Sequence, residues 1–396
     1  MIHMKKIDLY KINLLYVLVL AIVFFTLSEN GSMVSLCFLA TNLIIVTSFM
    51  RFFISKCKSR TLLFIIIILC IILSFSHVAL LAPSTVTNEY YTKVVLFSIS
   101  LMNGFYFLNS RINQSNLTFI FISHIVVSFF YLIFYNKGFS VFEGELLLTL
   151  NFSNPNTTGA FIVNTILYLL IFILSHGLNN KFLSFFIKFL CGCLVIGLFM
   201  LLQLTGCRSA LLALIFFIIA CFIDVCISDK IFKKKSVLLL FSIWAFVFAM
   251  VYLSLKGDFN IGDFANETAG KTSATRLRVW TDAIECINNN IFCGDYNKVF
   301  QNPLKQMHNT HLDIFASYGL IPFLLFIVYL YKLLRKSASH TTNLMSRSAL
   351  YAFMSCLILG IFEAGLVSGS TGLQVYTYGF LLIINFTSEE KLLNKK

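Results

Sequence analysis

Leu62–Phe75 reads LLFIIIILCIILSF, a run that carries no charge and whose one hydroxyl belongs to Ser74. A membrane-spanning β-strand alternates apolar and polar residues over about ten positions, and this run does not alternate. A helix rises about 1.5 Å per residue, so about 20 apolar residues cross the roughly 30 Å hydrocarbon layer of a membrane. The run therefore predicts a transmembrane α-helix.

Apolar runs of this kind recur along the whole chain. The 396 residues are 58% hydrophobic and 12% charged. A soluble globular domain has about 25% charged residues, so this composition excludes a soluble globular protein. We predict an all-α, polytopic integral membrane protein with about twelve transmembrane helices. The predicted spans lie near residues 12–27, 33–54, 61–82, 93–109, 117–135, 158–175, 182–204, 209–227, 236–255, 314–334, 348–366 and 371–387.

The domain organisation follows from these spans. We expect residues 1–396 to form a single membrane domain, with residues 256–313 as a long loop inserted between spans nine and ten. The first apolar run has no small-residue cleavage site, so we interpret it as a true first helix instead of a removed signal peptide. No internal repeat is apparent in the sequence.

The distribution of basic residues predicts the orientation. Short cytoplasmic loops are enriched in Lys and Arg. Most of the 30 basic residues fall at the two ends of the chain and in the connections after even-numbered spans, whereas the short loops on the other face hold Lys93, Lys137 and Arg208. We therefore expect both termini in the cytoplasm and the long loop on the outer, periplasmic or extracellular face.

The net charge of +13 has the same origin, together with attraction to anionic membrane lipids. No soluble basic face with interleaved aromatic residues is present, so we expect no nucleic-acid partner. No spacing of His and Cys resembles a metal site, and we expect neither a metal nor a cofactor. Whether Cys286 and Cys293 form a disulfide stays open.

The stretch NFSNPNTTGAF, residues 151–161, precedes the sixth span. We expect Asn156 to cap a helix that begins at Thr157, next to Asn154 and Pro155. Two interpretations remain: a simple capped helix start, or a helix start whose free amides and positive dipole end help bind an anionic or sugar ligand.

The stretch LQLTGCRSALLALIFF places Arg208 in a short outer turn between two apolar helices. The side chain could extend to lipid headgroups. Because the turn is short, we instead expect the side chain to point into a cavity between helices, where a guanidinium group would suit a phosphate.

The long loop contains TSATRLRVWTDAIECI, in which Leu277, Trp280, Ile284 and Ile287 repeat with helical spacing. This pattern predicts an amphipathic helix at the membrane face, with Ser273 or Thr275 available as its cap. Arg276 lies one turn before Trp280 on the same side, and Arg278 points elsewhere. The arginines could bind lipid headgroups or approach the bundle. Gly294 is expected to form a turn after this helix.

The stretch KQMHNTHLDIFASYGLIP, residues 305–322, gathers four polar residues, His308, Asn309, His311 and Asp313, where a helix would enter the membrane. His311 would follow His308 by one helical turn if the helix starts that early. Glu363, near the outer end of the eleventh span, places a costly carboxylate at the same face. We therefore predict a site formed by these residues together with Arg208 and Arg276.

The motifs NPNxxG at Asn154–Gly159, TGxRSALLA at Thr205–Ala213, RxxxW at Arg276–Trp280 and HN at His308–Asn309 occur in this order along the chain. In this the chain resembles the bacterial O-antigen polymerase and O-antigen ligase superfamily of membrane glycosyltransferases, of the GT-C type. The ligase-like spacing of HN, nine residues and Gly is met by Gly319. Pro322 and Tyr296 depart from the ligase pattern, and for this reason we favour a polymerase.

The resemblance implies a glycan donor carried on polyprenyl diphosphate in the bacterial inner membrane. His308, Arg208 and Arg276 would be catalytic, and Arg278, Asn309, Asp313, Glu363, Asn154 and Asn156 would bind substrate. The arginines would stabilise the leaving diphosphate, which requires no metal and agrees with the lack of a DxD motif. His308, partnered by Asp313, would orient or deprotonate the acceptor hydroxyl, and a one-step displacement would invert the anomeric centre.

The leading hypothesis is a polysaccharide repeat-unit polymerase, with a chain-length regulator and a flippase as further expected partners. The first alternative is a ligase that transfers finished O-antigen to a lipid core acceptor in lipopolysaccharide synthesis. An alternative of another class is a flippase or transporter of lipid-linked oligosaccharide. A transporter predicts charges at mid-membrane and repeat symmetry, whereas here the charges gather at one face.

Overall fold

The computed structural model of the chain describes residues 2–56, 66, 67, 69, 88–110, 112–142, 144–152, 154–175, 181–226, 238, 242, 244, 245, 249, 271–292, 294, 295, 299, 309–341, 343–363 and 371–393. Most of these residues are helical. The described helices are α1 (Ile2–Leu27), α2 (Gly31–Lys56), α4 (Asn88–Asn109), α5 (Gln114–Phe134), α6 (Pro155–Leu174), α7 (Lys181–Leu204), α8 (Arg208–Cys226), α11 (Lys271–Asn289), α13 (Thr310–Tyr318), α14 (Leu320–His340), α15 (Leu344–Phe362) and α16 (Thr371–Leu393).

The apolar helices confirm a multi-pass membrane protein. Within the described ranges, six helices are long and apolar enough to cross a membrane, namely those that cover residues 31–50, 114–137, 155–174, 182–204, 208–226 and 344–362. Shorter apolar stretches occur in α1, α4 and α16. The predicted spans near 61–82 and 236–255 lie almost entirely outside the described residues, so the number twelve stays a prediction.

The centre of the bundle is formed by α6 and α15. In each of these helices 78% of the most apolar window is buried inside the protein, against 28% in α2 and in α7. Cys356 Sγ of α15 donates to Asn164 Oδ1 of α6 at 3.0 Å, and Tyr168 Oη of α6 donates to the carbonyl oxygen of Tyr376 in α16 at 2.7 Å. The peripheral helices α2 and α7 keep wide apolar faces exposed, as lipid contact requires.

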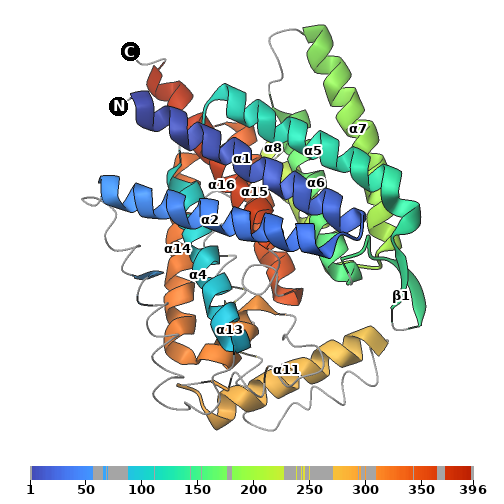
Figure 1. Cartoon of the computed structure of the whole chain (residues 1–396), viewed down its shortest axis with the longest axis vertical. Helices are drawn as coiled ribbons and strands as arrows, with labels where there is room; N and C mark the ends of the chain where they lie inside the picture. The colour runs from blue at the N-terminus through green and yellow to red at the C-terminus, as the bar shows by residue number, and fades with distance from the viewer. Residues whose placement is uncertain are drawn as a thin grey trace.

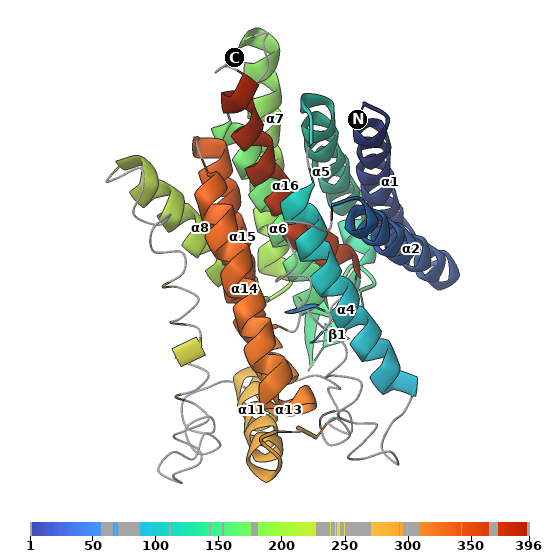
Figure 2. The same cartoon turned by 90° about the vertical axis from the view of Figure 1, so that its left-hand side faces the viewer.

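Two ends of the bundle can be distinguished (Figures 1 and 2). The first turn of α1 and the last turn of α16 lie at one end, which we call the terminal end. The helices α11 and α13 lie at the opposite end, which we call the loop end. The two ends of the described chain therefore lie opposite α11 and α13, whereas the cytoplasmic location of the terminal end and the outer location of the long loop stay predictions.

The described residues agree with the all-α prediction except in the connection between α5 and α6, which contains a short hairpin. After a 3₁₀ turn at Tyr135–Lys137, strands β1 (Phe139–Phe142) and β2 (Glu145–Leu148) form an antiparallel hairpin, with Gly144 at φ 88° in its turn. The amides of Thr149 and Leu150 donate to the carbonyl oxygen of Gly138 at 2.7 and 2.9 Å and close the base of the hairpin. Two strands of four residues are too short to show a clear alternating pattern in the sequence.

The single span predicted near 314–334 is wrong, because the structure has two helices there, α13 and α14. Gly319, at φ 82° and ψ −176°, separates α13 from α14. That backbone conformation is accessible essentially to glycine alone. Pro322 then lies in the first turn of α14, where its missing N–H group has no helical partner to lose. The break lets α13 form a separate short helix at the loop end.

Candidate functional site

The NPNxxG motif forms the start of α6, but not with the predicted cap. The helix begins at Pro155, and Asn154 is the cap, because its side-chain oxygen accepts from the amide of Asn156 at 2.8 Å. The expectation that Asn156 caps a helix starting at Thr157 is therefore wrong by two residues. Asn154 must be extended because it precedes a proline, and an extended residue with a side-chain oxygen is what an N-cap requires.

Arg208 is the first residue of α8 and follows a tight turn. Gly206 adopts a φ of 63°, and Thr205 Oγ1 accepts from the amide of Cys207 at 3.2 Å. The side chain of Arg208 is exposed instead of enclosed between helices, contrary to the expectation from the short turn. An exposed guanidinium at a helix start is accessible to an anionic group of a ligand.

The NPNxxG and TGxR motifs are in direct contact. A Cβ atom added at Gly159 would lie 2.5 Å from Cys207 Cβ and 2.9 Å from Cys207 Sγ, so glycine allows this approach. Cys207 Sγ also points to the carbonyl oxygen of Asn156 at 3.8 Å. The start of α6, with Asn154 and Asn156, is thereby held against the turn that leads into Arg208.

The amphipathic helix predicted in the long loop is confirmed as α11. Trp280, Ile284 and Ile287 are buried, as the helical spacing predicted. The helix begins at Lys271, so Ser273 and Thr275 lie inside it and do not precede it as caps. Arg276 and Arg278 occupy positions in this helix four and two residues before Trp280. The indole of Trp280 lies beside the ring of Phe362, with centroids 6.3 Å apart, which joins α11 to the end of α15.

The HN motif leads into α13. Asn309 is the N-cap of this helix, and its side-chain oxygen accepts from the amides of His311 and Leu312 at 2.9 and 3.1 Å. His308 lies outside the described residues and directly precedes this cap in the sequence, so α13 does not start early enough to place His308 and His311 on one helix. Thr310 Oγ1 donates to the carbonyl oxygen of Glu363 at 2.9 Å.

These contacts bring part of the predicted site together. Asn309 and Glu363, far apart in the sequence, meet through Thr310, and Trp280 of the RxxxW motif contacts Phe362, the residue before Glu363. Asn309, Asp313 and Glu363 are buried, with 1, 7 and 8% of their surface exposed. The start of α13, the end of α15 and α11 therefore form one cluster at the loop end.

The turn at Gly294 is confirmed and locks α11 onto α13. Gly294 adopts a φ of 63°, and a Cβ atom there would lie 2.4 Å from the carbonyl oxygen of Ala316. The amide of Asp295 donates to that carbonyl at 2.7 Å, and the amide of Leu320 donates to the carbonyl oxygen of Ile291 at 2.9 Å. The end of α11 is thus fixed against the junction of α13 and α14. Cys293 lies outside the described residues, so its disulfide with Cys286 stays untested.

His311 is fully buried in α13. Neither of its ring nitrogens has a hydrogen-bond partner, and its ring lies 6.1 Å from that of Phe326. Burial lowers the pKa of His311 from 6.5 to about 4, because the charged imidazolium would lose its hydration. His311 is therefore neutral near pH 7, and it does not share the exposure that a proton acceptor for a bound substrate requires.

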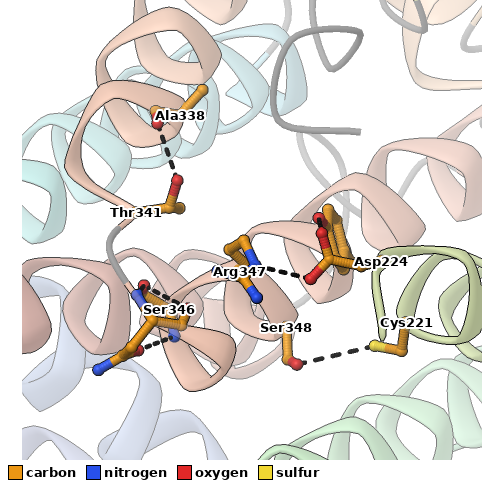
Figure 3. A network of polar contacts seen from close by, with 9 residues as sticks. Cys221, Asp224, Ala338, Thr341, Ser346, Arg347 and Ser348 are labelled. Atoms are coloured by element: carbon orange, nitrogen blue, oxygen red, sulfur yellow. Dashed lines mark hydrogen bonds and ion pairs between the residues drawn. The ribbon is translucent and has the colours of Figure 1, made fainter. Parts of the chain in front are cut away.

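A charged cluster that the sequence did not lead us to expect lies between α8 and α15 (Figure 3). Asp224 of α8 is fully buried and forms an ion pair with Arg347 of α15. A carboxylate inside the predicted span 209–227 is unfavourable in lipid, and that signal was available in the sequence. Over the described part of the chain, no three His, Cys, Asp or Glu side chains gather as metal ligands would.

Residues 192–327 match the family model described as O-Antigen ligase. The matched stretch includes Arg208, the two arginines of α11 and the HN motif, and it ends in α14. A comparison with curated proteins gives no match. The family match agrees with the motifs and confirms the resemblance that they carry. Residues 192–327, about a third of the chain, are therefore similar to the O-antigen ligase family.

Proposed function

We propose that the protein is a polysaccharide repeat-unit polymerase of the O-antigen type. It transfers a growing glycan from polyprenyl diphosphate to the next lipid-linked repeat unit. The observation that carries the proposal is the cluster at the loop end, where the hydrogen bond from Thr310 to Glu363 and the contact of Trp280 with Phe362 join three motif-bearing segments. The family match over residues 192–327 supports the reaction class.

The donor diphosphate binds at the arginines in this proposal. The exposed guanidinium of Arg208 lies at the start of α8, where free amides and the helix dipole also favour an anion. Arg276 and Arg278, both residues of α11, supply further positive charge to the diphosphate. Together they stabilise the negative charge that develops as the polyprenyl diphosphate leaves, so that a metal ion is not needed. Asn154 and Asn156 bind substrate at the start of α6.

The acceptor hydroxyl binds at the start of α13. His308 precedes the cap residue Asn309 and orients or deprotonates the hydroxyl, and Asp313 in the first turn assists it. Glu363, which is tied to Thr310, completes the binding site. One direct displacement at the anomeric carbon then breaks its bond to the diphosphate oxygen, forms the bond to the acceptor oxygen and inverts the configuration.

The proposed location follows the charge bias of the sequence. The terminal end of the bundle faces the cytoplasm, and the loop end faces the outer side of the bacterial inner membrane. A flippase would then deliver the lipid-linked repeat unit to the loop end, and a chain-length regulator would act beside the polymerase. The glycan is built on the face where the proposed site lies.

A ligase is the second candidate, because the matching family model is described as O-Antigen ligase. A ligase would use the same donor and the same arginines, with a lipid core as the acceptor. Pro322, where the ligase pattern has a small or aromatic residue, lies in the first turn of α14. We favour the polymerase because Tyr296 and Pro322 both depart from the ligase pattern.

Deleting the gene distinguishes the two candidates on a gel of surface glycolipids. Loss of a polymerase leaves the lipid core capped with a single repeat unit. Loss of a ligase instead leaves intact polymer on its polyprenyl carrier, and that result would reject the polymerase. In the complemented strain, Arg208→Ala, Arg276→Ala and His308→Ala proteins should insert normally and make no polymer. Full-length polymer from the His308→Ala strain would contradict the proposed acceptor chemistry.

A further inference from the structure

The charged cluster between α8 and α15 joins two helices that each carry a residue of the proposed site. Arg347 Nε lies 2.6 Å from Asp224 Oδ2, and Tyr351 Oη donates to Asp224 Oδ1 at 2.8 Å. One turn earlier on α8, Cys221 Sγ donates to Ser348 Oγ at 3.7 Å (Figure 3). Both carboxylate oxygens of Asp224 are therefore bonded to α15.

The spacing along the two helices is equal. Sixteen residues separate Arg208 from Asp224 on α8, and sixteen separate Arg347 from Glu363 at the end of α15. At about 1.5 Å per residue, both distances are about 24 Å. The two helices pack together and run in opposite directions, so their equal spacing from the ion pair predicts a similar depth for Arg208 and Glu363.

Stability alone does not account for such a pair. Asp224 is fully buried within a helix apolar enough to span a membrane, where an ionised carboxylate is unfavourable. Replacing a buried ion pair by well-packed apolar residues is often neutral or stabilising, and the best-attested use of buried charges is to fix the register of packed helices. The remaining residues of α8 and α15 are mostly apolar, and apolar contacts specify the axial register of two helices less sharply than a charged pair does.

We propose that Asp224 and Arg347 are positioning residues, which fix the axial register of α8 against α15 and thereby hold Arg208 at the depth of the α13 and α15 cluster. This inference rests on the proposed function, in which Arg208 contacts the donor diphosphate. A slip of one helical turn would move Arg208 by about 5.4 Å relative to Glu363. Such a displacement removes the guanidinium from reach of the leaving group while the bundle stays folded.

The test measures glycan transfer by full-length protein in membranes, with a polyprenyl-diphosphate-linked repeat unit as substrate. Asp224→Asn should lower kcat by about 10-fold or more, because a misplacement of about 1 Å near the reacting atoms already costs about 100-fold. The KM for the lipid-linked substrate should change less than kcat. Tyr351→Phe, which keeps the ion pair and removes one hydrogen bond, should give a smaller loss of kcat.

The decisive comparison combines the variants in a double-mutant cycle. In an Arg208→Lys background, which keeps a cation at this position, Asp224→Asn should cause little further loss, because both changes affect the same contact. Independent, multiplicative losses would overturn the inference, since they would show that Asp224 acts on stability or on another group. The same cycle with Tyr351→Phe decides the question if Asp224→Asn protein does not accumulate in the membrane.

Cys221→Ala is the matched control. It removes the weak sulfur contact between the same two helices and leaves the ion pair, so kcat should stay within about two-fold of wild type. Wild-type kcat in Asp224→Asn protein would overturn the inference while leaving the proposed function intact. Wild-type transfer by Arg208→Ala protein would instead refute the proposed role of Arg208 itself, so the two failures are distinguishable.

Discussion

Replacing Gly159 by alanine should separate the starts of α6 and α8, which carry Asn154 and Arg208. The added Cβ would lie 2.5 Å from Cys207 Cβ, whereas ordinary contacts begin at 3.4 Å. The two segments must therefore move apart by about 1 Å, because a protein interior is close-packed and cannot absorb the overlap locally.

The expected effect on stability and on transfer can be estimated from this displacement. Overpacking a well-packed interior typically costs about 1–3 kcal/mol. A shift of about 1 Å at a reacting group costs about 100-fold in rate. We therefore expect the free energy of unfolding to fall by about 1–3 kcal/mol, and glycan transfer to fall by far more than this destabilisation alone would cause.

The assay compares Gly159→Ala protein with two matched variants by apparent Tm in detergent and by transfer rate in membranes. Gly192→Ala in α7 is the control, because nothing lies within 4 Å of a Cβ at that position. It should gain stability slightly, by about 0.5–1 kcal/mol. Cys207→Gly removes the atoms that the new Cβ would overlap, and glycine is tolerated at the N-cap of α8. The double variant Gly159→Ala/Cys207→Gly should therefore recover transfer. Gly159→Ala protein as stable and active as the Gly192→Ala control would refute the reasoning.

Two further predictions concern α13. Asn309→Ala removes the acceptor for two helix amides, so the free energy of unfolding should fall by about 1–2 kcal/mol and glycan transfer should be lost. The control Asn343→Ala removes the cap of α15 at the terminal end and should lower the apparent Tm by a similar amount while transfer is kept. Equal transfer by both variants would contradict the proposed role of Asn309. His311→Phe removes two unpartnered buried nitrogens and should stabilise the protein by about 1–3 kcal/mol at pH 7, measured as a higher apparent Tm. Because the folded pKa of His311 is lowered to about 4, wild-type stability should fall by about 3 kcal/mol as the pH drops from 6.5 to 4, and the His311→Phe variant should lack this part of the pH dependence. Unchanged pH dependence in the variant would show that His311 is not buried in its neutral form.

The helical membrane fold could be predicted because each membrane-spanning helix needs a long apolar run, and such runs are visible in the sequence. The ends of the helices were harder to predict, because neighbouring residues can each serve as the N-cap. Asn154 and Asn156 are both good caps, and Pro155 decides between them by keeping Asn154 extended. Gly319 and Pro322 gave a similar signal for the break between α13 and α14, which the apolar pattern concealed.

The candidate site could be predicted only in part. Asn309 and Glu363 were expected at one face, and they do meet through Thr310. Which atoms touch depends on side-chain packing between distant segments, and no local pattern records the contact of Gly159 with Cys207. Asp224 was missed although a carboxylate in a membrane span is a strong signal, because its partner Arg347 lies 123 residues away in the sequence.

Reconstitution of the purified protein in liposomes that contain only a polyprenyl-diphosphate-linked repeat unit tests the central claim most directly. Polymer length and released polyprenyl diphosphate are measured together. The wild-type protein should form polymer and release about one polyprenyl diphosphate per new linkage, and Arg208→Ala protein should do neither. Transfer that occurs only after a lipid core acceptor is added, or wild-type polymer from Arg208→Ala protein, would contradict the proposed polymerase.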